Sequence, residues 1–172
     1  ASKKAGRDRV SVWRAEDHAA DAGAGKTIEV MDPDKDRSAP KGRVLVIDDE
    51  EPLRRLLQRM LERAGYRVAV EADGESARRR VRENPGAYDV ALVDVILERE
   101  SGLDLLQELK ELDEHLVKII MTGNVTVDNA VASLRRGAYD FIGKPIVRDQ
   151  LVAVVGRALT YRNLVVENER YQ

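Results

Sequence analysis

The sequence predicts an α/β protein in which five parallel strands form a doubly wound sheet with helices on both faces. Apolar runs rich in Val, Ile and Leu alternate with segments of helical periodicity between residues 43 and 160. The first run, residues 44–47, is unbroken and stops at charged side chains, as expected for a strand that is buried on both faces. Repeated alternation of this kind is typical of right-handed crossovers around a parallel sheet.

The elements follow one another in a regular order. Apolar runs predict strands at residues 44–47, 66–70, 88–93, 116–121 and 139–142. Apolar residues spaced by three or four predict helices at residues 50–64, 74–83, about 103–112, about 127–137 and from about 149 onward. Gly65 is expected to stop the first helix, and the turn at 84–86 the second. The last helix runs past the natural end of such a domain, so we expect an extended C-terminal helix.

Strands and helices in this order favour the flavodoxin-like strand order 2-1-3-4-5. The winding of such a sheet changes direction between its first and third strands, and ligands bind at the carboxyl ends of the strands there. Asp48 and Asp49 follow the first strand, and Asp94 follows the third. We therefore expect these three carboxylates to meet in one crevice.

The adjacent carboxylates Asp48 and Asp49 admit two interpretations. At ~5 Å and an effective dielectric of ~20 they repel one another by roughly 3 kcal/mol. A bound Mg²⁺ would relieve this repulsion, because it prefers oxygen ligands. Alternatively, one of the two caps the helix that follows, while Glu50 and Glu51 complement the helix dipole. The stretch alone does not separate a metal site from a helix cap.

Two further polar residues are expected at the same edge of the sheet. Thr122 follows the fourth strand and Lys144 follows the fifth. Together with the carboxylates and a cation, they suit the transfer of a phosphoryl group to a carboxylate. Asp94 has no acidic neighbour in sequence and is the candidate nucleophile. Lys144 would neutralise phosphoryl charge, while the Thr122 hydroxyl and the Gly123 N–H would bind phosphoryl oxygens.

Four motifs, in order and at matching spacing, resemble the receiver domain of response regulators in two-component signalling. They are Val-Ile-Asp48-Asp49-Glu50, Leu-Val-Asp94 followed by Ser101-Gly102, Met-Thr122-Gly123, and the stretch from Gly137 through Phe141 to Lys144-Pro145. The resemblance covers residues 43 to 160 and is nearest in pattern to nitrogen-regulator-class receivers. It implies that Asp94 accepts a phosphoryl group from a sensor histidine kinase or a phosphotransfer protein. Beyond self-phosphorylation and autodephosphorylation at Asp94, it implies no enzyme activity.

The resemblance also implies a metal site made of oxygen ligands. Asp49 and Asp94 would bind Mg²⁺ directly, Asp48 mostly through water, and Ile96 through its backbone carbonyl. The sequence departs from the family at Glu98, where proline is usual. We expect the charged loop 98–101 to be less restrained as a result, and the extra carboxylate to change metal affinity or phosphate lifetime.

The same resemblance implies a switch and a dimer. Thr122 would be the switch hydroxyl, Lys144 a phosphate partner, and Phe141 the aromatic residue that turns inward on activation. The Lys144–Pro145 bond is expected to be cis. The face made by the fourth helix, the fifth strand and the last helix would then change shape, controlling homodimerisation or an attached output domain.

The last helix is expected to take part in dimerisation. An approximate heptad seam is formed by Leu151, Val154 or Val155, Ala158, Tyr161 or Arg162, Val165 and Asn168. Residues 43–160 would thus form the receiver, and residues 161–172 would continue the last helix as a linker or coiled coil. The arginine runs at 54–55, 78–80 and 135–136 are expected on solvated helix faces.

Composition narrows the function classes. With no cysteine among 172 residues, thiolate metal sites and thiol nucleophiles are excluded. A net charge of −2 argues against direct nucleic-acid binding. No apolar run is long enough for a membrane span and the N-terminus lacks a signal-peptide pattern, so a cytoplasmic protein is expected.

Residues 1–42 differ in character and are expected to be a flexible N-terminal extension or the remnant of a preceding domain. Short strands are possible at 10–13 and 27–31. Gly25-Lys26-Thr27 suggests a phosphate-binding loop, but Ala20 stands where that motif needs glycine.

Two competing functions remain. A haloacid-dehalogenase-like phosphatase also uses an Asp, a Thr and a Lys at strand ends, but it needs a second Asp two residues after the nucleophile, where Ile96 stands. A receiver-like protein-binding module that works without phosphorylation is kept open by Glu98.

Overall fold

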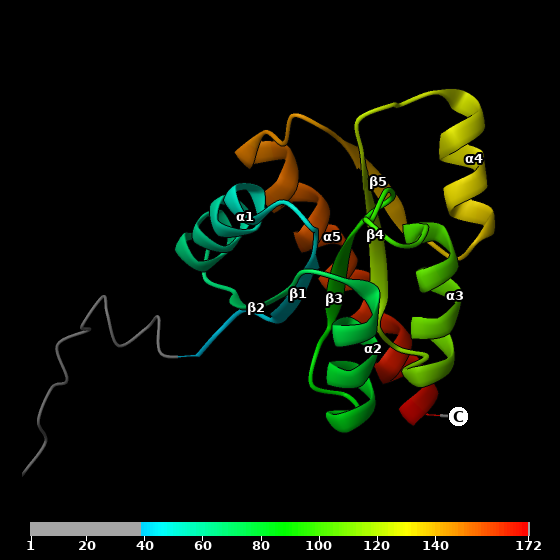
Figure 1. Ribbon diagram of the computed structural model, residues 1–172. Coiled ribbons are helices and arrows are strands. Elements are labelled where there is room, and N and C mark those ends of the chain that lie inside the picture. Colours follow the sequence, from blue (N-terminus) through cyan, green and yellow to red (C-terminus); the bar gives the residue numbers. More distant parts are fainter. Residues whose placement is uncertain (1–38, 172) are drawn as a thin grey trace, which may run out of the picture. The chain divides into compact units, whose positions relative to one another are not determined.

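The computed structural model describes residues 39–171, which form five strands and five helices arranged as the sequence predicts (Figure 1). The strands are β1 Arg43–Ile47, β2 Arg67–Glu71, β3 Val90–Asp94, β4 Val117–Thr122 and β5 Asp140–Gly143. The helices are α1 Glu51–Arg63, α2 Gly74–Glu83, α3 Gly102–Leu112, α4 Val127–Arg135 and α5 Arg148–Arg170. None of the helices in this part of the chain is long and apolar enough to cross a membrane.

All strand pairs are parallel, and their order is β2-β1-β3-β4-β5. This confirms the predicted topology. Because β1 pairs directly with β3, with Val44 opposite Val90, the residues that end these two strands are neighbours. The carboxyl ends of all five strands meet at one edge of the sheet.

Helices cover both faces of the sheet, and each face has its own core (Figure 1). On one face, Leu57 of α1 and Leu151 of α5 pack against β1, β3 and β4 without any exposed surface. On the other face, Ala77 of α2 and Leu106 of α3 are equally buried. In α4 the only buried residue is Ser133.

Two strand boundaries differ from the predicted ones in a way that matters for the site. Asp94 and Thr122 are the last residues of β3 and β4, rather than the first residues after them. Each is 5–6% exposed, so the sheet itself holds both side chains in place.

The ordered domain also begins earlier than residue 43. The Lys41 N–H donates to the Gly65 carbonyl at 2.9 Å, and the Arg67 N–H donates to the Gly42 carbonyl at 2.9 Å. Gly65 has φ 103°, which explains why a glycine follows the first helix. The predicted strands at 10–13 and 27–31, and most of the predicted extension, lie outside the described residues.

The predicted coiled-coil seam on the last helix is wrong in its first half. Leu151, Val154, Val155 and Ala158 are at most 3% exposed, because they form the core between α5 and the sheet. An amphipathic pattern shows that a helix face is apolar but not which surface covers it. This part of α5 is therefore not available to a second chain.

Beyond Ala158, α5 continues past the sheet and contacts its own domain through polar and aromatic side chains. The rings of Tyr161 and Tyr139 lie 5.0 Å apart between centroids. Arg162 Nη1 lies 3.1 Å from a carboxylate oxygen of Asp89, which also pairs with Arg43.

Candidate functional site

Three carboxylates meet at the carboxyl edge of the sheet. One oxygen from each of Asp48, Asp49 and Asp94 lies within 4.8 Å of the others. Asp48 is fully buried, Asp94 is 5% exposed and Asp49 is exposed. The structure therefore brings together the three acidic residues that the sequence analysis selected.

Backbone N–H groups hold the two buried carboxylates in place. Asp48 Oδ1 accepts a hydrogen bond from the Glu50 N–H at 2.8 Å, and Asp94 Oδ1 accepts one from the Ile96 N–H at 3.1 Å. The N-cap residue of α1 is Glu50, and its side chain makes no capping hydrogen bond. The interpretation of Asp48 or Asp49 as the helix cap is therefore wrong.

Lys144 reaches into the acidic cluster from the end of β5. Its Nζ lies 3.2 Å from Asp48 Oδ2 and 3.1 Å from Asp94 Oδ2. The Lys144 N–H donates to the Thr122 carbonyl at 2.7 Å, and the Lys144–Pro145 bond is cis, as expected. One ammonium faces three carboxylates, so a divalent cation would balance the remaining negative charge.

The site shifts the pKa of both buried partners. Burial raises the pKa of Asp94 and the charge of Asp48 adds to this, while the Ile96 N–H and Lys144 oppose it, and the net direction is upward. Burial alone would lower the pKa of Lys144, but Asp48 and Asp94 outweigh it and the pKa rises. Lys144 is therefore a permanent cation at neutral pH, and a metal ion would favour ionised Asp94.

Thr122 and Phe141 line one cavity beside this cluster. The cavity measures about 410 Å³ and lies between α3, α4 and the end of β4. Thr122 Oγ1 accepts the Asn124 N–H at 3.1 Å, within the loop that begins at the exposed Gly123. Phe141 is half-buried against the core on the α3 side. The aromatic ring therefore has open space beside it, shared with the threonine.

Specific backbone contacts hold the loop after Asp94. Ile96 and Ser101 form a β-bridge, and the Leu97 N–H donates to the Glu100 carbonyl at 3.1 Å. Gly102 is needed here, because a Cβ at this position would lie 2.0 Å from the Asp94 carbonyl oxygen. Specific contacts therefore hold the loop, and its lower restraint relative to a loop with proline at position 98 stays a prediction.

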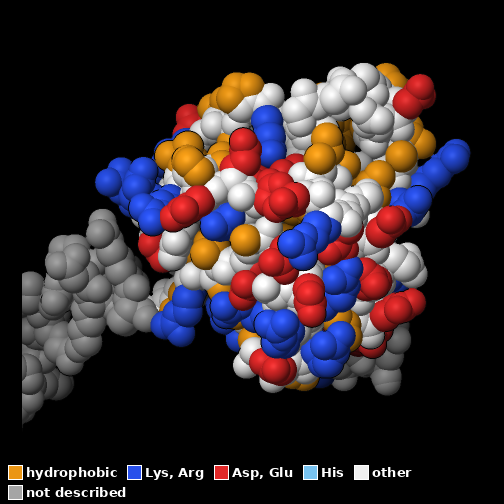
Figure 2. Space-filling view, viewed as in Figure 1, with side chains coloured by type: hydrophobic (Ala, Val, Ile, Leu, Met, Phe, Trp, Pro, Cys, Tyr) orange, Lys and Arg blue, Asp and Glu red, His pale blue; other side chains and the backbone are white. Residues whose placement is uncertain are grey.

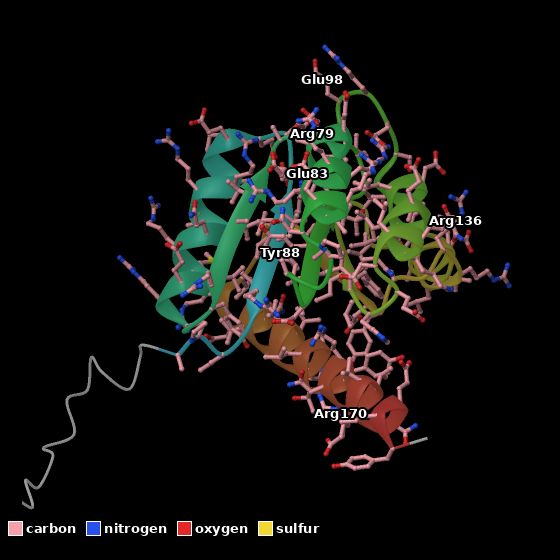
Figure 3. The ribbon with its side chains drawn as sticks, turned by 90° about the horizontal axis from the view of Figure 1, so that it is seen from below. Arg79, Glu83, Tyr88, Glu98, Arg136 and Arg170 are labelled. Carbon is pink, nitrogen blue, oxygen red and sulfur yellow. The ribbon has the colours of Figure 1, made fainter. Side chains whose placement is uncertain are left out.

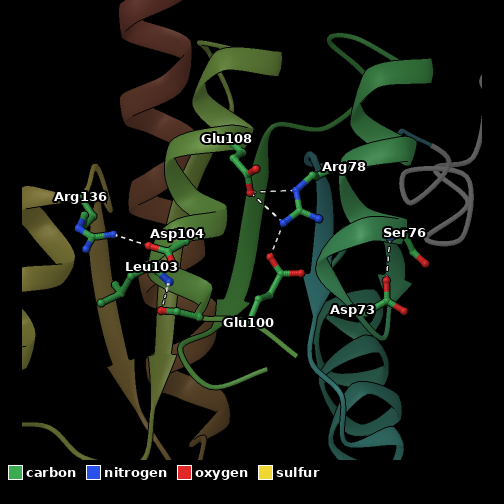
Figure 4. A network of polar contacts seen from close by, with 9 residues as sticks. Asp73, Ser76, Arg78, Glu100, Leu103, Asp104, Glu108 and Arg136 are labelled. Atoms are coloured by element: carbon green, nitrogen blue, oxygen red, sulfur yellow. Dashed lines mark hydrogen bonds and ion pairs between the residues drawn. The ribbon is translucent and has the colours of Figure 1, made fainter. Parts of the chain in front are cut away.

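The two glutamates of this loop have different surroundings. Glu100 pairs with Arg78 of α2, which also contacts Glu108 of α3 at 2.8 Å (Figure 4). Glu98 points outward at the tip of the loop (Figure 3), and it lines a cleft of about 400 Å³ together with Asp49. Glu98 thus shares a cleft with Asp49, and the ion pair of Glu100 with Arg78 connects the loop to α2.

Sequence reasoning missed two arginines that support the site. Arg54 Nη1 donates to the Asp48 carbonyl at 2.7 Å, and Arg78 ties the loop to α2 and α3. Both belong to runs expected on solvated faces, and both make specific contacts instead. The spacing of Arg54, one turn into the helix after Asp48, was a usable signal.

Comparison with known proteins identifies the family. The profile described as "Response regulator receiver domain" matches residues 44–156, so the chain belongs to this family. It is a receiver of phosphorylation-dependent signalling in a two-component system.

Two curated relatives and two solved structures illustrate the similarity. The C4-dicarboxylate transport transcriptional regulatory protein DctD of Pseudomonas aeruginosa is 40% identical over 126 residues, which is 73% of this chain and 27% of DctD. The DNA-binding transcriptional regulator NtrC of a Bradyrhizobium species is 35% identical over 120 residues, or 70% and 25% of the two chains. The chain thus spans about a quarter of the length of these relatives.

Two solved structures of receiver domains are similar to this chain over nearly their whole length. The receiver domain of NtrX from Brucella abortus has a TM-score of 0.63 and 35% identity, over 68% of this chain and 98% of that one. The beryllofluoride-activated NtrC4 receiver domain dimer has a TM-score of 0.65 and 30% identity, over 70% of this chain and 98% of the NtrC4 chain.

Proposed function

We propose that Asp94 is the phosphoacceptor of this receiver, acting with Lys144 and a bound Mg²⁺. The observation that supports the proposal is the position of Asp94, buried at the end of β3, 3.1 Å from Lys144 and beside two further carboxylates. Asp49 and Asp94 are the proposed direct metal ligands, with the Ile96 carbonyl as a third, and Asp48 acts mostly through water. Mg²⁺, when bound, supplies positive charge next to the incoming phosphoryl oxygens.

The residues divide the chemistry between them. A carboxylate oxygen of Asp94 forms a bond to phosphorus while the phosphorus–nitrogen bond of a phosphohistidine on the partner breaks, and the imidazole leaves as a neutral base after taking up a proton. Lys144 neutralises charge on the transferred group. The Thr122 hydroxyl and the Gly123 N–H bind phosphoryl oxygens. To do so, the Thr122 hydroxyl gives up its hydrogen bond with Asn124 and donates to the phosphoryl group instead.

Movement of Thr122 would carry the signal to α4. In the proposed switch, Thr122 draws in the loop after β4, and Phe141 enters the cavity that both residues line. The face formed by α4, β5 and α5 then changes shape.

We propose that this face supports homodimerisation or contact with an output domain. Apolar side chains are exposed along α4, with Val127 at 79%, Val131 at 40% and Leu134 at 48%, and Figure 2 shows apolar surface in this region. The proposed phosphodonor is a sensor histidine kinase or a phosphotransfer protein. No direct contact with nucleic acid is part of the proposed function of residues 43–160.

Phosphate uptake tests the proposal against its two competitors. We expect Mg²⁺-dependent incorporation of one phosphoryl group from acetyl phosphate, and none in Asp94→Asn. Asp104→Asn, at an exposed position outside the site, is the matched control and should label normally. Continued turnover of small phosphate esters would instead indicate a phosphatase, and absence of labelling in the unaltered chain would indicate a module that works without phosphorylation.

A further inference from the structure

A second group of metal-ligating side chains lies at the opposite edge of the sheet from the acidic cluster, where β4 begins. Glu114 and His115 precede β4, and Glu169 belongs to the last turn of α5, which ends at Arg170 (Figure 3). One ligand atom from each of these three side chains lies within 4.8 Å of the other two. The receiver site described above uses none of them.

The turn between α3 and β4 is held by its own hydrogen bonds. The Leu116 N–H donates to the Asp113 carbonyl at 3.2 Å, and the His115 N–H donates to Asp113 Oδ1 at 3.1 Å. Asp113 Oδ2 also accepts the Gly86 N–H at 3.2 Å, which connects this turn to the one that follows α2. Glu114 and His115 are the two central residues of the turn, so the positions from which both side chains extend are fixed.

The distance between the imidazole and one carboxylate matches an edge of a metal coordination sphere. His115 Nε2 lies 3.2 Å from Glu169 Oε1. Two ligands of a tetrahedral Zn²⁺, each about 2.0–2.2 Å from the ion, lie roughly 3.3–3.5 Å from one another. Glu114 is exposed, so its side chain can rotate toward the same point. A protonated imidazole would also pair with Glu169, and a metal ion would take the place of that proton.

We propose that Glu114, His115 and Glu169 bind a transition-metal dication of the Zn²⁺ class, with water completing the coordination. A neutral imidazole favours such an ion over Mg²⁺, which prefers oxygen ligands. The two carboxylates balance the charge of the ion. Lys110 and Lys118 line the cavity beside these ligands, and their positive charge lowers the affinity. We therefore expect a dissociation constant roughly in the micromolar range.

Occupancy of this site would act on the C-terminal helix. Its ligands come from the turn before β4 and from α5 beyond Ala158, where the helix leaves the core. An ion held by both would connect the extension of α5 to the receiver, whether or not Asp94 carries phosphate. Hydrogen exchange of the backbone at residues 165–170 should therefore slow when the ion binds.

Calorimetric titration of the whole chain with Zn²⁺ tests the proposal, with excess Mg²⁺ present for the acidic cluster. His115→Gln should weaken Zn²⁺ binding by at least about tenfold, because loss of even an outer-shell partner of a metal typically costs that much. His18→Gln removes the other histidine of the chain and is the matched control, which should bind as the unaltered chain does. Zn²⁺ that still enters the acidic cluster contributes equally to all three titrations, so their difference isolates the second site.

A second pair of variants tests the contribution of α5. Glu169→Gln should also weaken binding, whereas Glu167→Gln, at an exposed position of the same helix, should not. Slower exchange at residues 165–170 with Zn²⁺, seen in the unaltered chain and lost in His115→Gln, would confirm that the ion connects α5 to the turn. Absence of saturable Zn²⁺ binding, equal affinity in His115→Gln and the unaltered chain, or an equal loss in His18→Gln would overturn the proposal.

Discussion

Helices α3 and α4 flank the same cavity but are held in very different ways. In α3, Leu105, Leu106 and Leu109 are fully buried, and Glu108 contacts Arg78 of the neighbouring α2 (Figure 4). In α4 only Ser133 is buried, and apolar residues such as Val127 and Leu134 face solvent. The difference indicates that α3 is a fixed wall next to Asp94, whereas α4 can shift at low cost in free energy.

Truncation of one apolar side chain in each helix should show the largest difference. Leu106→Ala leaves a cavity in a closed core and should lower the free energy of unfolding by about 2–5 kcal/mol. Val131→Ala, at a 40% exposed position of α4, should lower it by less than about 1 kcal/mol. Urea unfolding followed by circular dichroism measures both. Equal losses would show that α4 is as firmly packed as α3.

A smaller effect is expected from the polar link between α2 and α3. Arg78→Met removes the contacts of Arg78 to Glu100 and Glu108. Both glutamates are partly exposed, so the substitution should lower the free energy of unfolding by about 1 kcal/mol. Because Glu100 belongs to the loop after Asp94, protease cleavage of that loop should also become faster. Arg79→Met changes a residue with one weak, exposed contact to Glu75 and is the control. If both variants behave alike, Arg78 does not hold the loop.

The smallest effect on stability is expected for substitution of Thr122. The same substitution should have a large effect on the response to phosphorylation. Thr122→Ala loses the two hydrogen bonds that its hydroxyl makes with the backbone of Asn124, at 3.1 and 3.4 Å, and should lower the free energy of unfolding by about 1 kcal/mol. It should still accept phosphate at Asp94 but lose most of the phosphorylation-dependent change in oligomeric state. Sedimentation velocity with and without beryllofluoride measures that change. A full response in Thr122→Ala would remove Thr122 from the switch.

The sequence predicts the part of this structure that depends on local pattern. Apolar runs and helical spacing located every element, and the topology followed from their alternation, which placed Asp48 and Asp94 on neighbouring strands. The contacts of Arg78 and the burial of Leu151 were not predictable in this way. Both depend on which surface packs against a helix face, and neither helical period nor charge specifies that surface.

Lys118 is a second example of a residue whose surroundings the sequence pattern does not predict. It interrupts the apolar run at 116–121 without changing the strand prediction, because one polar residue is compatible with a strand. Its burial, with only 5% of the residue exposed, becomes visible only when β4 is paired with β3 and β5.

The most direct test of the account is chemical identification of the phosphorylated residue. Borohydride reduces an aspartyl phosphate to homoserine, which peptide mass spectrometry locates by its change in mass. After treatment with a phosphodonor and Mg²⁺, we expect homoserine at position 94 and at no other acidic position. Homoserine at 48 or 49, or an unmodified residue 94 in a protein that carries phosphate, would contradict the assignment of Asp94 as the phosphoacceptor.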